Sequence, residues 1–327
     1  MYFFTKFDIF HFYYITLRKF KAKHHTCLFF FNWCIIIKSL KSEGEIMLEN
    51  RLPEVVLNDG LRIPMLGFGT AKLKGIEGVE AVTSAIHAGY RLIDTAYNYE
   101  NEGAIGEAIR RTNISREELR ITSKLPGRYH AYKEAIKAIQ ESLFRANLDY
   151  FDLYLIHWPN PKENMYTEAW QALIDAKRWG LVRSIGLSNF LPEHIEKLKD
   201  ETGVLPSINQ IELHPFFNQK EQVEWHKKYH IKTEAWSPLH RAEDLSNNET
   251  LQSIADSYKR SIAQIVLRWH YQNGVITIPK ASSPKHQLDN LSIFDFSLRD
   301  EDMEAIHLLT KPDGRMSDQD PREYQEF

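Results

Sequence analysis

From Met47 onward, one alternation recurs along the chain. Short apolar runs bounded by polar residues are separated by stretches in which apolar residues return every three or four positions. The runs have the length of buried strands, and the stretches have the spacing of amphipathic helices. Eight such runs occur: MLGFGT, RLIDTA, LRITSK, FDLYLIHW, VRSIGLSN, SINQIEL, KTEAWS and VITIPK.

Strands and helices in alternation predict a parallel sheet, because each helix carries the chain back to the start of the next strand. Eight such units in roughly 280 residues predict an α/β fold, the closed (β/α)8 barrel or TIM barrel. An open doubly wound sheet is the competing arrangement. Before the first barrel strand, the stretch EVVLNDGLRIP predicts a β-hairpin that turns at Asn58, Asp59 and Gly60. We expect this hairpin to plug the bottom of the barrel.

Residues 1–46 differ in composition from the rest of the chain. They are crowded with Phe, Tyr, Ile and Lys, whose codons are rich in A and T, and the first 40 contain no Gly or Pro. Glu43 to Ile46 back-translate to a purine-rich run of the kind that precedes a bacterial start codon. We therefore expect residues 1–46 to be upstream DNA read as protein, with Met47 as the true start and residues 47–327 as one barrel domain. A membrane-surface anchor or a genuine extension is the alternative.

The same leader bears on where the protein resides. Its longest apolar run, Leu28 to Ile37, is about half the ~20 residues that a membrane span needs, and no small-residue cleavage site follows it. Both cysteines, Cys27 and Cys34, lie in the leader, so residues 47–327 contain no thiol that could form a disulfide. A cytoplasmic protein that does not bind membranes is expected.

Charge and composition narrow the range of partners. The net charge is −3 and 43% of residues are hydrophobic, as in an ordinary globular protein. Binding to nucleic acid rests on clustered Lys and Arg, and no such cluster occurs, so no nucleic-acid partner is expected. The sequence shows no interface signature, and a monomer is expected.

Each predicted strand ends in a polar or ionisable residue. These residues are Thr70, Asp94, Lys124, His157, Asn189, Gln210, Ser237 and Lys280. The carboxyl ends of parallel barrel strands share one face, and barrel enzymes hold their active sites there. We therefore expect these side chains to line an active site.

The segment DTAYNYENE adds two tyrosines, Tyr97 and Tyr99, to this face. A free tyrosine has a pKa near ~10 and is a poor acid at pH 7 unless a cation favours its phenolate. Lys124 can be that cation, and Asp94 on the adjacent strand can keep it charged. His157, one strand further on, can donate to a substrate oxygen. These residues predict a site that delivers a proton to a carbonyl oxygen, with either tyrosine as the donor.

In order and spacing, the segments GFGT, DTAYNYENE, TSK, LIHWP, GLSNF, NQIELHP and IPK resemble the motifs of the aldo-keto reductases, over residues 47 to about 313. The resemblance implies a (β/α)8 barrel that binds NAD(P)H across its C-terminal face without a Rossmann fold. It implies transfer of hydride to an aldehyde or ketone. It also implies a catalytic set of Asp94, Tyr99, Lys124 and His157, with Tyr99 as the general acid, and so selects Tyr99 over Tyr97.

The resemblance also implies a set of residues that contact the cofactor. Side-chain amides and a hydroxyl suit the donors and acceptors of the nicotinamide carboxamide, and an aromatic side chain can stack on the nicotinamide ring. The implied contacts are Ser188, Asn189 and Gln210 for the nicotinamide carboxamide, Trp236 for its ring, Ser237 and Leu239 for the pyrophosphate, Thr70 for a ribose, Lys280 and Ser282 for the adenosine 2′-phosphate, and Asn290 for adenine.

Several residues depart from the family's pattern. Ala71 replaces a bulky aromatic residue of the substrate pocket, and His240 with Arg241 replaces part of a glycine-rich loop. Ala281 replaces a common serine. His286 stands where arginine is usual, and a histidine is mostly neutral at pH 7. We therefore expect NADPH to be preferred and NADH to be used as well, with an open pocket for small aldehydes, α-dicarbonyls or keto-sugars.

Two other classes of protein fit parts of the pattern. A regulatory or binding protein on the same barrel, without turnover, would resemble the potassium-channel β subunits. A metal-dependent barrel hydrolase would need several converging His, Asp or Glu side chains, and Lys124 would repel its cation. His226 and His230 have the spacing of paired metal ligands, but no glutamate completes a zinc motif. A solvated helix face is expected there, and no metal is predicted.

Overall fold

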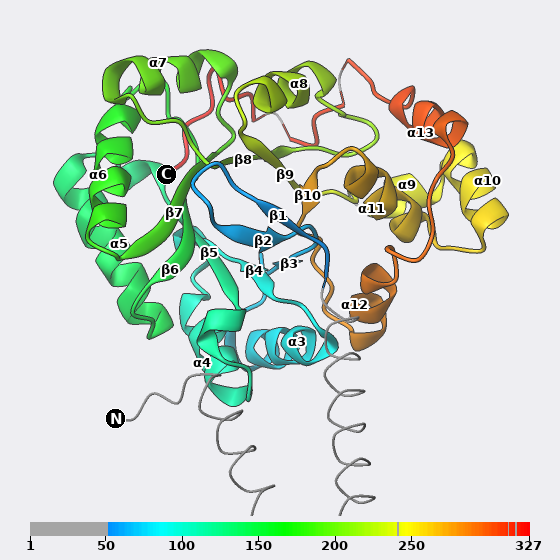
Figure 1. The fold of residues 1–327 in the computed structure, drawn as a ribbon, viewed down its shortest axis with the longest axis horizontal. Helices are drawn as coiled ribbons and strands as arrows, with labels where there is room; N and C mark the ends of the chain where they lie inside the picture. The colour runs from blue at the N-terminus through cyan, green and yellow to red at the C-terminus, as the bar shows by residue number, and fades with distance from the viewer. Residues whose placement is uncertain (1–51, 241, 313, 318) are drawn as a thin grey trace, which may run out of the picture. The chain divides into compact units, whose positions relative to one another are not determined.

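The computed structural model describes residues 52–327 apart from residues 241, 313 and 318. The leader and Met47 lie outside the described residues, so the expected start of translation stays a prediction. The described chain begins with a hairpin, drawn in blue in Figure 1. Its strands β1 (Glu54–Val56) and β2 (Arg62–Pro64) pair antiparallel, as predicted. Gly60 in the turn has a φ of 93°, a conformation that glycine adopts without strain.

Eight parallel strands follow in one sheet, in the order in which they occur in the chain. They are β3 (Phe68–Gly69), β4 (Leu92–Asp94), β5 (Arg120–Leu125), β6 (Phe151–Ile156), β7 (Val182–Ser188), β8 (Ile208–Glu212), β9 (Lys232–Trp236) and β10 (Ile276–Thr277). Leu66, just before β3, bridges Thr277 of β10, and the Gly67 N–H donates to the Thr277 carbonyl over 2.7 Å. These contacts join the two edges of the sheet, and the predicted barrel with its hairpin is confirmed.

Helices connect the strands and surround them (Figure 1). They are α3 (Gly75–Ala88), α4 (Glu102–Arg111), α5 (Tyr132–Ala146), α6 (Tyr166–Arg178), α7 (Pro192–Thr202), α8 (Lys220–Lys228), α9 (Ala242–Ser246), α10 (Glu249–Tyr258), α11 (Ile262–Gln272), α12 (Pro284–Leu291) and α13 (Asp300–His307). The loops contain the 3₁₀ turns η1 (Tyr97–Tyr99), η2 (Arg116–Glu118) and η3 (Gly127–Tyr129). In the part of the chain that the structure describes, no helix is long and apolar enough to cross a membrane.

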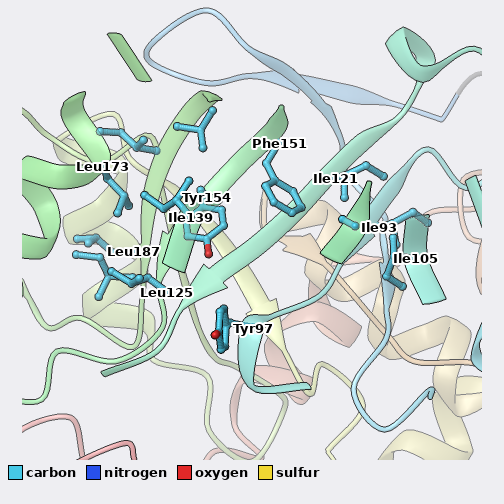
Figure 2. Close-up of a cluster of buried hydrophobic side chains, with 14 of the residues drawn as sticks. Ile93, Tyr97, Ile105, Ile121, Leu125, Ile139, Phe151, Tyr154, Leu173 and Leu187 are labelled. Carbon is cyan, nitrogen blue, oxygen red and sulfur yellow. The ribbon is translucent and has the colours of Figure 1, made fainter. Parts of the chain in front are cut away.

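The helices pack against the outer face of the sheet through a continuous apolar layer. In α3, for example, Val79, Val82 and Ile86 recur at helical spacing and are buried. Gly89 ends this helix with a φ of 118° and donates its N–H to helix carbonyls. Figure 2 shows part of the layer under the next helices, where strand residues Ile93, Ile121, Phe151 and Tyr154 lie with helix residues Ile105, Ile139 and Leu173.

The barrel interior changes from apolar to polar along the strands. Successive side chains of a strand point to opposite faces, so every second residue faces inward. Near the hairpin the inward residues Leu92, Leu153, Ile208 and Ile276 pack with Leu57 and Ile63 of the hairpin. The hairpin therefore plugs this end, as predicted. Two residues further along, the inward positions are polar, as in Asp94 after Leu92 and Gln210 after Ile208.

Gly67 and Gly69 have a packing role inside this barrel. A Cβ atom on Gly69 would lie 2.5 Å from the carbonyl oxygen of Ile278, and one on Gly67 would lie 2.7 Å from the side chain of Leu92. At residue 69 the backbone after β10 approaches β3 so closely that only glycine fits.

The prediction of a solvated face at His226 is wrong. The His226 side chain is completely buried on the inner side of α8, and burial lowers its pKa to about 3. Its neutral ring is held on both sides, with Nδ1 2.9 Å from Thr233 Oγ1 and Nε2 3.0 Å from Asn209 Nδ2. Polar partners inside the fold thus compensate the burial of a polar residue. His230 lies beyond the end of α8.

Candidate active site

Asp94 and Lys124 form a buried ion pair at the carboxyl ends of β4 and β5. Lys124 Nζ lies 2.6 Å from Asp94 Oδ1 and donates to the Thr95 carbonyl oxygen at 2.9 Å. The two side chains have only 0% and 2% of their surface exposed. Burial alone would lower the pKa of Lys124, but the charge and the hydrogen bond of Asp94, together with Tyr99 and Glu234, outweigh it and the pKa is raised. Lys124 is therefore held as a cation.

Tyr99 lies beside this cation, whereas Tyr97 does not. Lys124 Nζ is 5.0 Å from the centre of the Tyr99 ring. Tyr97, two residues earlier in η1, belongs to the apolar layer outside the sheet (Figure 2), and its hydroxyl accepts a hydrogen bond from Arg145 Nη2 at 2.9 Å. The 3₁₀ turn thus directs the two tyrosines to different sides of the barrel wall.

The pKa of the Tyr99 phenol differs from the prediction made from the sequence, in which the charge of Lys124 lowers it. Burial raises the pKa of Tyr99 by more than Lys124 lowers it, and the pKa is raised overall. The phenol is therefore protonated at neutral pH. Lys124 can still stabilise the phenolate at the moment when the proton leaves.

His157 completes this group of side chains at the end of β6. Its ring meets the Tyr99 ring edge-on, with centroids 5.9 Å apart, and its Nδ1 lies 2.6 Å from Oε1 of Glu326. Glu326 comes from the last residues of the sequence, which run back across the barrel from α13 (Figure 1). Burial would raise the pKa of Glu326, but its contacts with His157, with the Gly127 N–H and with Asn98 lower it overall. No sequence pattern indicated this carboxylate.

Gln210 links the ion pair to a second carboxyl group. Its Nε2 donates to Asp94 Oδ2 at 2.9 Å and to Glu234 Oε2 at 2.7 Å. Glu234 lies on β9 with 0% of its surface exposed, and its burial, together with the charge of Asp94, raises its pKa to about 8. Glu234 was not predicted from the sequence, although its alternation with Trp236 in KTEAWS places both residues on the same face of the strand.

Three residues expected at the nicotinamide are connected to one another. Trp236 Nε1 donates to Asn189 Oδ1 at 2.7 Å, and Asn189 Nδ2 donates to Ser188 Oγ and to the His157 carbonyl, each at 3.0 Å. Asn189 has a φ of 63°, a conformation that asparagine tolerates better than most residues. This network holds the partly exposed indole of Trp236 next to the main chain of His157.

The next three expected cofactor residues lie at the ends of β9 and β3. After β9, Ser237 and His240 have positive φ angles of 46° and 50°, and the His240 N–H donates to the Ser237 carbonyl at 2.8 Å, with Leu239 half-buried in the turn. Such backbone strain persists only where the surroundings enforce it. Thr70 is fully buried, and its hydroxyl donates to the Asp94 carbonyl at 2.8 Å.

The expected 2′-phosphate and adenine residues lie along the start of α12. Lys280, Ser282 and His286 are exposed, and Asn290 is buried one turn further on. Ser283 caps the helix, and its Oγ accepts from the His286 N–H at 3.3 Å. The unpaired N–H groups and the dipole of a helix N-terminus favour an anion here. Within the described residues Lys280 forms no ion pair.

The fold and these side chains define the class of protein: a (β/α)8 barrel with a cluster of ionisable side chains at the carboxyl ends of its strands, where barrel enzymes hold their active sites. In the part of the chain that the structure describes, no group of three or more His, Cys, Asp or Glu residues could hold a metal ion.

Comparisons with known proteins specify the family. The family model for aldo/keto reductases matches residues 65–310. A 2,5-diketo-D-gluconic acid reductase B from Corynebacterium sp. (strain SHS752001) is 46% identical over 276 residues, which cover 84% of this chain and 99% of that protein. The glyoxal reductase of Bacillus subtilis (strain 168) is 43% identical over 258 residues, which cover 79% of this chain and 92% of that protein.

A solved structure agrees with these matches. The crystal structure of a Gox0644 mutant in complex with NADPH has a TM-score of 0.79 and 40% identity, over 83% of this chain and 97% of that one. The chain belongs to the aldo/keto reductase family. The prediction of an oxidoreductase that reduces carbonyl groups with NADP(H) is thereby confirmed.

Proposed function

We propose that the protein reduces small aldehydes and α-dicarbonyl compounds to alcohols, with NADPH as the preferred cofactor and Tyr99 as the general acid. The observation that carries the choice of Tyr99 is its place against Lys124. Lys124 is held as a cation by Asp94 at 2.6 Å and lies 5.0 Å from the centre of the Tyr99 ring. The competing donor, Tyr97, is bonded to Arg145 on the outer side of the sheet.

Each residue of the site has one task in this reaction. When bound, NADPH supplies a hydride to the carbonyl carbon, and the carbonyl oxygen takes up a proton to give the alcohol. Tyr99 delivers that proton from its hydroxyl, which burial keeps protonated until the oxygen becomes basic. Lys124 stabilises the phenolate that remains, and Asp94 keeps Lys124 charged. His157 lies beside Tyr99 and orients the substrate oxygen.

The residues present fit NADPH in two separate places. Trp236 offers a partly exposed indole whose Nε1 is held by Asn189, a geometry suited to stacking on a nicotinamide ring. At the other end, Lys280 and the N-terminus of α12 supply a cation and free N–H groups for a 2′-phosphate. The further contacts that we propose are Ser188 and Gln210 for the carboxamide, Ser237 and Leu239 for the pyrophosphate, Thr70 for a ribose, and Ser282, His286 and Asn290 at the adenosine end.

The substrate class is supported by the relatives and by the small residue at Ala71. The two curated relatives are named for the reduction of 2,5-diketo-D-gluconic acid and of glyoxal, which are both dicarbonyl compounds. Ala71 takes little space where an aromatic side chain would narrow a pocket. We also propose that the protein works in the cytoplasm as a monomer, and the absence of cysteine from residues 47–327 supports this location.

The test compares Tyr99→Phe with Tyr97→Phe, using methylglyoxal and NADPH. Tyr99→Phe removes only the proton donor, so kcat/KM should fall by the ~10²–10⁴-fold typical of lost acid catalysis, while NADPH still binds. Tyr97→Phe is the matched control. It removes one hydrogen bond to Arg145 outside the site and should leave kcat/KM within about threefold of wild type. Equal losses in the two variants would show that the proton donor is wrongly chosen.

The same assay tests the regulatory alternative. A protein that keeps the cofactor but has lost turnover would quench or shift NADPH fluorescence on binding and would oxidise no NADPH when methylglyoxal is added. The buried pair of Lys124 and Asp94 favours the enzyme, because a desolvated pair costs free energy that a binding protein has no need to retain.

A further inference from the structure

The final residues of the sequence, 322–327, cover the mouth of the active site, and we call them the C-terminal segment. The Tyr324 ring packs on that of Trp158, just after β6, with centroids 4.5 Å apart. The Phe327 carbonyl oxygen accepts a hydrogen bond from Arg128 Nη1 at 3.0 Å, at the loop after β5. Figure 1 shows this segment, in red, as it returns from α13 toward the middle strands. The segment is therefore fixed to loops that follow two neighbouring strands.

Asn160 fixes the main chain of Glu326 within this segment. Asn160 Nδ2 donates to the Glu326 carbonyl at 2.8 Å, and the Glu326 N–H donates to Asn160 Oδ1 at 3.0 Å. The Asn160 side chain is completely buried, so these bonds are shielded from water. Two bonds that fix the position of residue 326 are thus made by its backbone and do not involve its side chain.

The side chain of Glu326 points into the site. Its Oε2 accepts from the Gly127 N–H at 3.0 Å, and its Oε1 accepts from Asn98 Nδ2 at 2.7 Å. The same Oε1 lies 2.6 Å from His157 Nδ1. Only 7% of the residue is exposed, although it is an acid. The free-energy cost of burying this carboxylate is therefore offset by three polar neighbours at contact distance.

The charge of Glu326 is not neutralised by a lysine or an arginine. Within the described residues Glu326 forms no ion pair with either, and Arg128 donates to Asn98 Oδ1 and to the Phe327 carbonyl instead. His130 also faces Glu326, but burial lowers its pKa to about 4, so it is neutral at pH 7. The negative charge reaches the reacting group, because it contributes to the raised pKa of Tyr99. Of the groups that contact this carboxylate, His157 is the one whose ring also meets the Tyr99 ring.

We propose that Glu326 is a specificity-determining residue, whose carboxylate holds the Nδ1 edge of His157 and makes the pocket reject substrates that carry a carboxylate next to the reacting carbonyl. This inference rests on the proposed function. A substrate with a carboxylate next to its reacting carbonyl would place a second negative charge beside the buried carboxylate of Glu326, where like charges repel more strongly than in water. A neutral carbonyl compound meets no such repulsion.

The experiment compares two small carbonyl substrates that differ in charge. Methylglyoxal is neutral, and glyoxylate carries a carboxylate beside its aldehyde. We would measure kcat/KM for both, with saturating NADPH, in wild type and in Glu326→Gln. This substitution keeps the size of the side chain and the backbone bonds to Asn160, and it removes the charge. Glu323→Gln is the matched control, because Glu323 is an exposed acid of the same segment.

Glu326→Gln should raise the glyoxylate to methylglyoxal ratio of kcat/KM by about tenfold or more, the scale of one removed like-charge contact. Glu323→Gln should leave the ratio unchanged. A ratio in Glu326→Gln within twofold of wild type would overturn the inference. A chain that ends at Gln325 is a second test. If this truncation raises the ratio and Glu326→Gln does not, the segment excludes glyoxylate by its volume, and the inference that the charge of Glu326 excludes it is wrong.

These outcomes are distinct from a failure of the proposed function. If wild type reduces neither substrate, the proposed function is at fault. If wild type reduces methylglyoxal and Tyr99→Phe does not, the proposed function stands, and the ratio in Glu326→Gln alone decides the role of Glu326. Thermal unfolding of each variant verifies that the barrel is folded in the assay.

Discussion

Gln210 Nε2 lies 2.7 Å from Oε2 of Glu234, at the centre of the barrel and away from solvent. The other oxygen of Glu234, Oε1, is buried without a hydrogen-bond partner among the described residues. The same Nε2 also donates to Asp94, so a single amide separates two carboxyl groups. Burying two negative charges so close together would cost much free energy, so one of the two carboxyl groups must be protonated. Glu234 is the one whose pKa is raised, to about 8.

This raised pKa predicts a pH dependence of stability. The ordinary pKa of 4.5 is raised to about 8 in the folded protein, so the folded state binds the proton more tightly than the unfolded state. The contribution of neutral Glu234 is therefore fully present below about pH 4.5 and is lost as the pH rises to about 8, at up to ~1.4 kcal/mol per pH unit. Glu234→Gln keeps the acceptor for Gln210 and should remove this dependence.

Urea unfolding between pH 5 and pH 9 measures the difference. The free energy of unfolding of Glu234→Gln should exceed that of wild type by a few kcal/mol at pH 9, with a smaller gap at pH 5. Glu196→Gln, on the exposed face of α7, is the matched control and should follow the wild-type curve. Parallel curves for wild type and Glu234→Gln would mean that Glu234 is ionised in the folded protein throughout this range.

The close approach of β3 and β10 predicts a second effect on stability. A Cβ atom at residue 69 would lie 2.5 Å from the backbone oxygen of Ile278, which cannot rotate away. Gly69→Ala should therefore lower the free energy of unfolding by ~1–3 kcal/mol, the usual cost of overpacking. Gly103→Ala is the control, since its Cβ would meet nothing closer than 3.4 Å and would favour the helix. Similar stabilities for the two variants would contradict the packing argument.

Much of the site was predictable from strand periodicity, and the exceptions have physical reasons. Asp94, Lys124 and His157 end adjacent parallel strands, so barrel closure alone brings them together. The choice between Tyr97 and Tyr99 was not predictable in this way, because a 3₁₀ turn does not follow the two-residue period of a strand. It came only from the family resemblance.

Contacts between distant segments were the hardest to predict. Glu326 meets Asn160 across 166 residues, and nothing in the tail's composition indicates a docking site. His226 lies among charged residues in the sequence of its helix, which favours exposure. It is buried because Thr233 and Asn209, on neighbouring strands, supply its polar partners. In each case the polar partner that makes burial possible is supplied by another element, which a local pattern cannot show.

The composition break at Met47 predicts that the leader is dispensable. The hairpin, the barrel and every proposed site residue lie within residues 52–327. A chain that begins at Met47 should have the melting temperature and the kcat/KM of the full chain. As a control, a chain that begins at Met65 lacks Leu57 and Ile63, which fill the bottom of the barrel, and should unfold at a lower temperature. Loss of activity in the chain from Met47 would show that the leader belongs to the folded enzyme.

The last prediction concerns the choice between NADPH and NADH, and follows from the exposed side chain of His286 at the first turn of α12. A 2′-phosphate carries up to two negative charges, and arginine meets it with a bidentate fork that histidine cannot form. NADH should therefore be used measurably by wild type. His286→Arg should sharpen selectivity for NADPH by roughly 1–3 kcal/mol, the scale of a hydrogen bond to a charged group.

The measurement is kcat/KM for both cofactors in wild type and His286→Arg. The NADPH to NADH ratio should be higher in His286→Arg, since arginine meets the phosphate with a permanent charge and a bidentate fork. His87→Arg, an exposed histidine in the last turn of α3, is the control for the added charge and should leave the ratio unchanged. An unchanged NADPH to NADH ratio in His286→Arg would show that residue 286 does not face the phosphate, and the assignment of Lys280 and Ser282 to this site would have to be revised with it.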